Sequence, residues 1–359
     1  MRLATTLPPD TALSDVPAAV RRVERLGFDT VHVPETVHDS LSVALLALEH
    51  SSRVRVRVRM TLAFPRSPMV VAYAAWDLAR FSGGRFQLGL ATQVRGNIVG
   101  RFSMPWSNPA AQLTDYVRAL RAIFATFSRG GPLRYEGTHY RFDRLQPYFN
   151  PGPLDVPEPE IFTGGVNRLM CELAGAEADG LVTHPTNSHP RFLRGSVLPW
   201  LAAGVATAQR VSRPVLVVGA KAISAPDARS LREALAGARR EMAFLYSTPA
   251  YRPTLALLGH EDLGERLTQL IRDQQWDALP AALPDDVLAG IVPVGTYDEF
   301  PAVIGDWYGG LCDELSITTP ADTSADDRFA SMLEVVRAVP AAPDGLALAQ
   351  AASPAPPSG

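Results

Sequence analysis

Residues 51–93 read SSRVRVRVRMTLAFPRSPMVVAYAAWDLARFSGGRFQLGLATQ, a stretch that contains one strand–helix–strand unit. The runs 54–62 and 85–91 are rich in β-branched and apolar residues, and 68–81 between them places apolar side chains at helical spacing. Proline opens this helical stretch, and two consecutive glycines follow it. The pattern is typical of a βα unit whose strands lie parallel in one sheet.

The same alternation continues along the whole chain. Short apolar runs predict eight strands, at 2–6, 28–33, 54–62, 85–91, 160–163, 180–183, 214–219 and 314–318. Helical spacing follows at 12–26, 41–50, 68–81 and 110–127. Eight such pairs favour a (β/α)8 TIM barrel, an α/β fold whose strands are buried on both faces. A doubly wound open sheet is the alternative, but no G-x-G-x-x-G follows the first strand.

We expect residues 1–339 to form this barrel as a single domain with insertion loops. Three segments, 92–109, 129–159 and 247–290, are too long for ordinary connections between strand and helix. Loops of this length commonly carry function, and the leucine spacing of the third predicts helices. Residues 340–359 are of low complexity, and we expect them to be a disordered tail.

Composition excludes several classes of protein. With 47% hydrophobic and 20% charged residues among 359, the chain can bury a core, so it is not a disordered protein. The net charge is −3 and the basic residues are scattered, which argues against nucleic acid or an anionic membrane as a partner. Cys171 and Cys312 cannot build a disulfide framework. Without a signal-peptide pattern or a long apolar run, we expect a cytoplasmic protein.

In a barrel, the chemistry lies where the strands end at their carboxyl termini. Glu35, His38 and Asp39 follow the second strand and would suit a proton-transfer group oriented by a carboxylate. Alternatively, Glu35 and Asp39 cap the next helix, with Asp39 or Ser40 as its N-cap. No HExxH spacing and no GxSxG turn is present, so we expect neither a metal site nor a nucleophile elbow.

Two other strand ends carry candidate residues. Gly164 and Gly165 enter a helix at about Asn167, which leaves backbone N–H groups free to bind an anion such as phosphate. Two glycines are, however, also common in turns. His184 follows the sixth strand and is held extended by Pro185, so its ring would point into the barrel mouth or the sheet face; a buried core histidine is the alternative.

Residues 51–93 resemble the bacterial luciferase-like family of flavin- or deazaflavin-dependent oxidoreductases. That family has an R-I-R-L-G-T strand, a Pro-led helix with A-x-x-x-L-D-x-L-S-G-G-R, and an L-G-x-G strand, and SGGRFQLGLAT is the most specific match. PEIFTGGVN and LAGAEADGLVTHP are similar to its phosphate-binding turn and next strand. The resemblance runs from about residue 1 to 319, and AFPRSPM, ATQVRGN, FSMPW and YSTPAYRP resemble the subgroup usually assigned to coenzyme F-420.

This resemblance implies an oxidoreductase that uses reduced coenzyme F-420 or FMN. Hydride transfer to, or monooxygenation of, an apolar or aromatic small molecule would be its reaction. A homodimer is implied, with a separate flavin or deazaflavin reductase as a further partner. His38 and Glu35 are the implied catalytic residues. The implied cofactor-binding residues, with the phosphate on 164–167, are Arg59, Met60, Thr92, Gln93, Gly164, Gly165, Val166, Asn167 and His184.

The sequence departs from the family within strand 54–62. Arg57 and Arg59 stand where the family has small residues that let the ring pack, and strand alternation places both on the barrel-facing side. A buried guanidinium needs partners, so these arginines either pair with barrel carboxylates or fill the pocket. Ala91 narrows the same region, and Arg95 lies where many relatives have a glutamate. If the pocket has lapsed, the chain binds no cofactor and acts as a partner subunit or a cofactor-independent enzyme.

Overall fold

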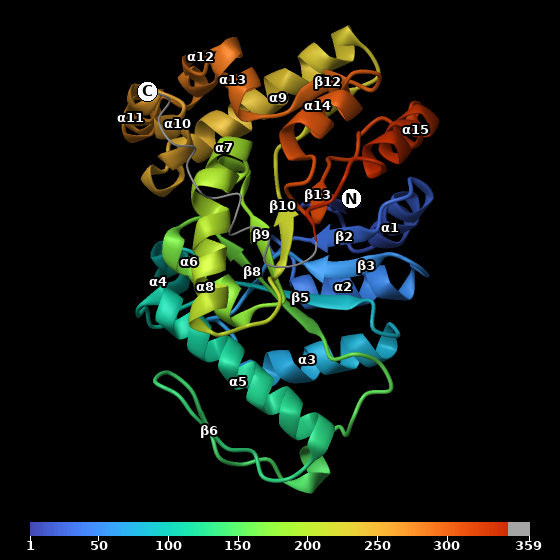
Figure 1. Ribbon diagram of the computed structural model, residues 1–359, viewed down its shortest axis with the longest axis vertical. Coiled ribbons are helices and arrows are strands. Elements are labelled where there is room, and N and C mark those ends of the chain that lie inside the picture. The colour runs from blue at the N-terminus through green and yellow to red at the C-terminus, as the bar shows by residue number, and fades with distance from the viewer. Residues whose placement is uncertain (344–359) are drawn as a thin grey trace, which may run out of the picture.

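Parallel strands form a ring at the centre of the molecule (Figure 1). They are β1 (Arg2–Thr6), β2 (Thr30–Val33), β3 (Arg55–Val58), β4 (Thr61–Leu62), β5 (Phe86–Ala91), β8 (Glu160–Gly165), β9 (Gly180–Thr183), β10 (Val215–Val218) and β13 (Glu314–Ser316). In this computed structural model, which describes residues 1–343, β1 lies between β2 and β13, and the pairing of β3 with β5 closes the ring. Because β3 and β4 together make one barrel strand, the predicted (β/α)8 TIM barrel is confirmed.

Helices surround the ring and bury their apolar faces against it. They are α1 (Val16–Arg25), α2 (Ser40–Glu49), α3 (Pro68–Phe81), α5 (Pro109–Arg129), α6 (Arg168–Glu177), α8 (Leu198–Thr207), α14 (Phe300–Tyr308) and α15 (Asp326–Arg337). Short α4 (Arg95–Gly100) and α7 (Pro190–Phe192) lie in connections. The core between helices and strands includes fully buried Trp76, Tyr116 and Phe124.

Capping residues fix where the helices begin. Asp39 is the N-cap of α2 and accepts a hydrogen bond from the backbone N–H of Ser42, so the capping interpretation of this residue is confirmed. Asp15 precedes α1, which has proline in its first turn. The predicted helix 12–26 was wrong at its start, because the N–H of Asp15 bonds to Ala12 in a turn.

Three differences between the predicted and the observed strands bear on the barrel mouth. The run 54–62 is not continuous: the backbone N–H of Arg59 bonds to Val33, and pairing resumes only at Thr61. Residues 160–163 are prolonged to Gly165, so the two glycines end a strand instead of forming a turn. The last strand is shorter than 314–318 and ends at Ser316.

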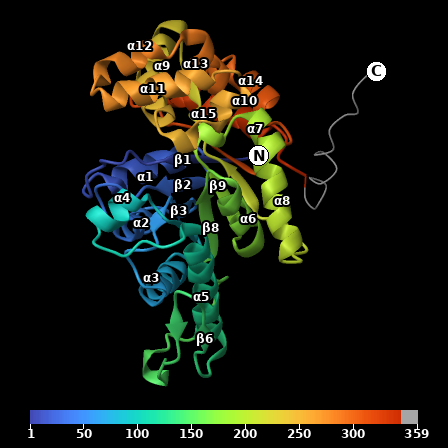
Figure 2. The same ribbon diagram turned by 90° about the vertical axis from the view of Figure 1, so that its left-hand side faces the viewer.

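The three long segments have distinct structures. Segment 92–109 contains α4, and 129–159 contains the hairpin of β6 (Tyr135–Glu136) and β7 (Arg141–Phe142), which extends away from the barrel beyond α5 (Figures 1 and 2). Segment 247–290 is helical, as its leucine spacing predicted. With α9 (Ala228–Tyr246) it forms a layer on the side of the barrel opposite the hairpin: α10 (Pro253–Leu257), α11 (Glu261–Arg272), α12 (Leu279–Ala282) and α13 (Asp285–Ile291).

This helical layer, which we call the cap, has an apolar core of its own around Met242, Leu255 and Leu267. Two short strands, β11 (Ile223–Ala225) and β12 (Val294–Thr296), join its ends. Within residues 1–343, no helix is both long and apolar enough to cross a bilayer. Of the predicted tail 340–359, residues 344–359 lie outside the described part of the chain.

Candidate active site at the barrel mouth

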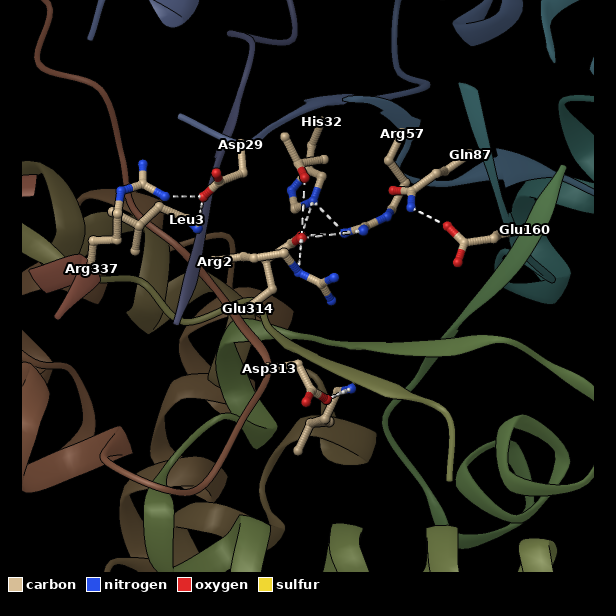
Figure 3. A network of polar contacts seen from close by, with 12 residues as sticks. Arg2, Leu3, Asp29, His32, Arg57, Gln87, Glu160, Asp313, Glu314 and Arg337 are labelled. Atoms are coloured by element: carbon tan, nitrogen blue, oxygen red, sulfur yellow. Dashed lines mark hydrogen bonds and ion pairs between the residues drawn. The ribbon is translucent and has the colours of Figure 1, made fainter. Parts of the chain in front are cut away.

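A buried ionic cluster fills the middle of the barrel (Figure 3). Arg57 on β3 donates to Glu314 on β13, with 2.5 Å between Nη1 and Oε1, and both side chains are fully buried. Its guanidinium lies 3.9 Å from the centre of the Phe162 ring. The hydroxyl of Thr30 donates to the other carboxylate oxygen of Glu314 at 3.1 Å. Arg57 is therefore paired with a barrel carboxylate and does not fill the mouth.

His32 on β2 completes this cluster as a neutral ring. Its Nε2 lies 3.0 Å from Nη1 of Arg57, and because a guanidinium only donates, Nε2 accepts. Burial lowers the pKa of His32 to about 3. Burial alone would raise the pKa of Glu314, but the charge of Arg57 holds it far below its usual range. His32 is fully buried and is therefore a structural part of the barrel interior.

Arg59 lies two residues nearer the carboxyl end of the same strand, and its side chain crosses the mouth. Nη1 donates to the hydroxyl of Thr6 at 3.1 Å, and Nη2 approaches the carbonyl of Thr183 at 3.4 Å. Within residues 1–343, no carboxylate lies within ion-pair distance of it. Burial, with the nearby charge of Arg57, lowers the pKa of Arg59 to about 10, so it remains charged at neutral pH.

A cavity of about 700 Å³ opens above Arg59. Its walls follow the carboxyl ends of β1, β9, β10 and β13, which is where barrels carry their active sites. The volume lies within the usual range for a cofactor or small-molecule site. The wall is mainly apolar, with hydroxyl groups between the apolar side chains: Thr6, Leu7, Pro8, Pro9, Thr11, Pro185, Ala220, Ser316, Ile317, Thr318 and Thr319.

Gly219, directly after β10, allows Arg59 to reach this position. A Cβ atom at residue 219 would collide with Nη2 of Arg59 and with the carbonyl oxygen of Thr183. The backbone N–H of Gly219 is bound by the Thr183 hydroxyl at 3.0 Å, which fixes this turn. The path of the guanidinium therefore depends on the absence of a side chain at 219.

His184 joins the barrel to the cap. Its ring stacks on Tyr251 with 4.5 Å between ring centres, and Nδ1 lies 2.8 Å from the hydroxyl of Thr186. The hydroxyl of Thr254, also in the cap, donates to the carbonyl of Thr186. Burial, together with Arg59, lowers the pKa of His184 to about 4. The backbone of His184 is extended, as the following proline predicted.

The predicted pair of His38 and Glu35 is not joined in the structure. Glu35 accepts from Arg66 at 2.8 Å and from the hydroxyl of Ser40 at 2.7 Å. Arg66 also binds the carboxylate of Asp39 at 2.6 Å. No hydrogen bond links His38 to Glu35 within the described chain, so the carboxylate orients an arginine instead of the imidazole. A catalytic role for His38 and Glu35 stays a prediction.

The predicted phosphate site lies at the start of α6. Asn167 is the N-cap, and its side chain accepts from the backbone N–H of Met170 at 3.1 Å. The first turn of α6 contains no acidic residue, and its other N–H groups lack intrahelical acceptors. Gly164 and Gly165 end β8 directly before it, with half-buried Val166 between them and the cap. This geometry suits an anion, although these residues do not line the 700 Å³ cavity.

Thr92 and Gln93 follow β5 and lie half-buried at the same end of the barrel. Gln93 has a positive φ of 60°, and its side chain accepts from the backbone N–H of Val94 at 2.8 Å. The hydroxyl of Thr92 donates to the carbonyl of Gln93. Among residues 1–343, no group of three or more histidine, cysteine or acidic side chains is arranged to hold a metal.

The sequence interpretation missed the wall formed by β1, β10 and β13. Thr6, Gly219 and Thr318 each stand at or beside the end of a predicted strand, so the rule that barrel sites lie at strand ends could have found them. Tyr251 and the Lys221–Glu241 ion pair, 2.5 Å long, had no such signal because the cap brings them in from distant segments.

We expect the free energy of unfolding to fall as the pH is lowered from about 7 to about 5. The pKa values of His32 and His184 are about 3 and 4 in the folded protein, against an ordinary value of 6.5, so the unfolded chain binds more protons in this interval. Each contributes up to about 1.4 kcal/mol per pH unit. Urea denaturation of the wild type and of His184→Gln measures this, and the variant should show the shallower fall. Equal pH dependence in both proteins would contradict a neutral, buried His184.

The chain is similar in sequence to known proteins. A sequence model described as luciferase-like monooxygenase matches residues 1–313. An uncharacterized protein of Mycobacterium bovis is 38% identical over 299 residues, covering 82% of this chain and 86% of that protein.

Solved structures also share the fold. The coenzyme F-420 dependent tetrahydromethanopterin reductase of Methanopyrus kandleri superposes with a TM-score of 0.73 at 17% identity, covering 94% of this chain and 98% of that one. The oxygenating constituent of 3,6-diketocamphane monooxygenase from Pseudomonas putida, in complex with FMN, has a TM-score of 0.65 at 14% identity, covering 95% and 98%. At these identities the likeness establishes the fold alone.

Proposed function

The chain belongs to the luciferase-like monooxygenase family, and from this membership we propose that it is an oxidoreductase that uses reduced coenzyme F-420 or FMN. Its substrate is a small organic molecule that accepts hydride or is monooxygenated. The observation that carries the proposal is the 700 Å³ cavity at the carboxyl ends of the barrel strands. Relatives of this fold include enzymes named for each cofactor.

The residues present fit a phosphate-bearing redox cofactor. The start of α6, led by two glycines and free of acidic side chains, suits the phosphate. The cavity beside these residues is large enough for a small organic substrate, and its apolar wall suits an apolar or aromatic body. Arg57, which would have obstructed a ring, is fully buried beneath the mouth.

We assign the cofactor-holding roles accordingly. Gly164, Gly165, Val166 and Asn167 would hold the phosphate, and five residues at neighbouring strand ends, together with Tyr251 of the cap, would border the ring. When bound, the cofactor supplies a hydride or, if it is FMN, also the means of activating dioxygen. The residues that would border the ring are Arg59 through its backbone, Met60, Thr92, Gln93, His184 and, from the cap, Tyr251.

Side chains of the protein would limit the access of water, form hydrogen bonds in the site and transfer protons. The cap, held by the stacking of His184 on Tyr251, limits the access of water to the mouth. His184 stays neutral near pH 7, so it accepts or donates a hydrogen bond without adding charge. His38 and Glu35 remain our proposed proton-transfer residues, and Arg66 holds the Glu35 carboxylate in place. The proposed partners are a second copy of the chain and, with FMN, a reductase.

One observation favours a second candidate function. The side chain of Arg59 crosses the mouth to Thr6 and Thr183, where the family pattern has a small residue. A ring excluded by this guanidinium would leave a family member that binds no flavin and serves as a partner subunit or a cofactor-independent enzyme.

Fluorescence titration of the purified protein with oxidised coenzyme F-420 and, separately, with FMN tests the proposal. We expect saturable quenching by one of the two at micromolar protein, because the phosphate site and the cavity are both preformed. Circular dichroism controls for folding. If neither compound binds to the folded protein, the oxidoreductase proposal fails and the second candidate function is favoured.

A further inference from the structure

Three cationic side chains line the mouth cavity, and two of them are neutralised. Arg22 forms an ion pair with Asp326 at 2.6 Å, and Lys221 pairs with Glu241 at 2.5 Å. Arg59 has no acidic partner within residues 1–343, since the Glu314 carboxylate beneath it is bound by Arg57. The cavity therefore carries uncompensated positive charge at its floor.

The acceptors that Arg59 does have leave donors unused. A guanidinium has five N–H donors, and this one makes a 3.1 Å bond to Thr6 and a long 3.4 Å contact to the Thr183 carbonyl. Both acceptors are neutral. A buried charge without a counter-ion costs free energy, and an oxyanion that binds in the cavity beside the guanidinium would offset that cost.

We propose that the cavity binds a small organic molecule with an apolar body and a carboxylate-type anionic group, and that the Arg59 guanidinium receives the anion. The apolar walls around Leu7, Pro185 and Ile317 fit the body, and the hydroxyl groups of Thr318 and Thr319 lie beside it. Guanidinium groups bind carboxylates with two parallel hydrogen bonds, which also fixes orientation. Naming this molecule as the substrate rests on the proposed function; the anion site itself does not.

An oxyanion in this cavity has two sources, the substrate or the cofactor. We assign the guanidinium to the substrate because the structure offers the phosphate a separate place at α6, outside the cavity lining. The backbone of Arg59 remains in the cofactor-binding set. The test must therefore follow both ligands in the same variants.

The probes are 3-phenylpropanoate and its amide, 3-phenylpropanamide, which differ in charge but hardly in shape. Their effect on the melting temperature would be measured for the wild type, Arg59→Met, Arg59→Lys and Arg55→Met. Arg55→Met is the matched control, since Arg55 lies on the same strand but is exposed at the opposite end of the barrel. F-420 and FMN titrations of the same proteins form the second arm.

We expect the carboxylate, not the amide, to stabilise the wild type and Arg55→Met. Arg59→Met should weaken carboxylate binding by about tenfold or more, while Arg59→Lys keeps part of it. The carboxylate should lose far more of its affinity in Arg59→Met than F-420 or FMN does. A wild type that binds the carboxylate but neither cofactor would contradict the proposed function and leave the anion site standing.

Two results would overturn the inference. Equal stabilisation of wild type and Arg59→Met by the carboxylate, or none in either, means that the guanidinium receives no substrate anion. Loss of F-420 or FMN binding in Arg59→Met, with the carboxylate inert, would assign Arg59 to the cofactor. If Arg59→Met melts without a folded baseline, the comparison of Arg59→Lys with wild type decides, because loss of carboxylate selectivity is expected only from the proposed site.

Discussion

Glu314→Ala is expected to lower the free energy of unfolding by about 3–5 kcal/mol, because it leaves the Arg57 charge buried without a counter-ion. Both side chains are fully buried, and the pair is closed by a 2.5 Å hydrogen bond. Figure 3 shows that Arg2 and His32 also face this carboxylate, and neither is acidic, so neither can replace it as the counter-ion of Arg57. Urea denaturation near neutral pH measures the loss.

The double variant Arg57→Met with Glu314→Leu should lose far less. Replacing both members of a buried ion pair with apolar side chains of similar volume is often neutral or stabilising, because the cost of desolvating two charges disappears. His32 then loses the donor to its Nε2, which limits the recovery. Glu172→Ala is the surface control: its partner Arg168 is exposed, and such pairs contribute less than about 1 kcal/mol.

The single and the double variant together show what the ion pair of Arg57 and Glu314 contributes to stability. A large loss in Glu314→Ala with recovery in the double variant means that the pair costs stability when it is broken and adds little when it is intact. If Glu314→Ala loses no more free energy of unfolding than the surface control, Arg57 must bind water or another acceptor in the variant. The charge of Arg57 would then not be buried without a partner, contrary to the expectation. If the double variant is as unstable as the single one, the ion pair contributes packing that apolar side chains do not supply.

Sequence periodicity was sufficient for the fold and for the position of the helix start after the two glycines. Strands and helices follow from local pattern, and Asn167 at the start of α6 follows from a glycine pair before a helix. The different fates of Arg57 and Arg59 could not be predicted, because both lie on the same face of one strand. Their difference arises from Glu314, which is more than 250 residues away in sequence. Its carboxylate pairs with Arg57 and leaves Arg59 without an acidic partner in the described part of the chain.

The partner of Glu35 could not be predicted from the sequence either. Its neighbour His38 is three residues away in sequence, whereas Arg66, its actual partner, comes from the connection after the next strand. Charge spacing along a loop does not specify which side chains will pair, because the partner can come from another connection of the barrel, as Arg66 does. The ends of the strands predict where the site of a barrel lies, but which side chains pair within that site depends on tertiary packing.

Val166→Asp is expected to weaken binding of the phosphate-bearing cofactor by about a hundredfold, because repulsion between two anions near a protein surface is worth a few kcal/mol. Val166 lies between Gly165 and the N-cap Asn167, so the new carboxylate would stand at the start of α6. An acidic residue there favours the helix macrodipole, so the fold should not suffer. Fluorescence titration with F-420 or FMN measures the change.

Val166→Asn is the control of nearly equal shape without the charge, and it should bind within a fewfold of the wild type. Riboflavin, which lacks the phosphate of FMN, is the matched ligand: its weaker binding should be the same in wild type and Val166→Asp. Equal weakening of FMN and riboflavin would place the effect on the ring, and unchanged FMN binding would remove the phosphate from α6. Only selective loss of the phosphate-bearing ligand is consistent with a cofactor anchored by its phosphate at the start of α6.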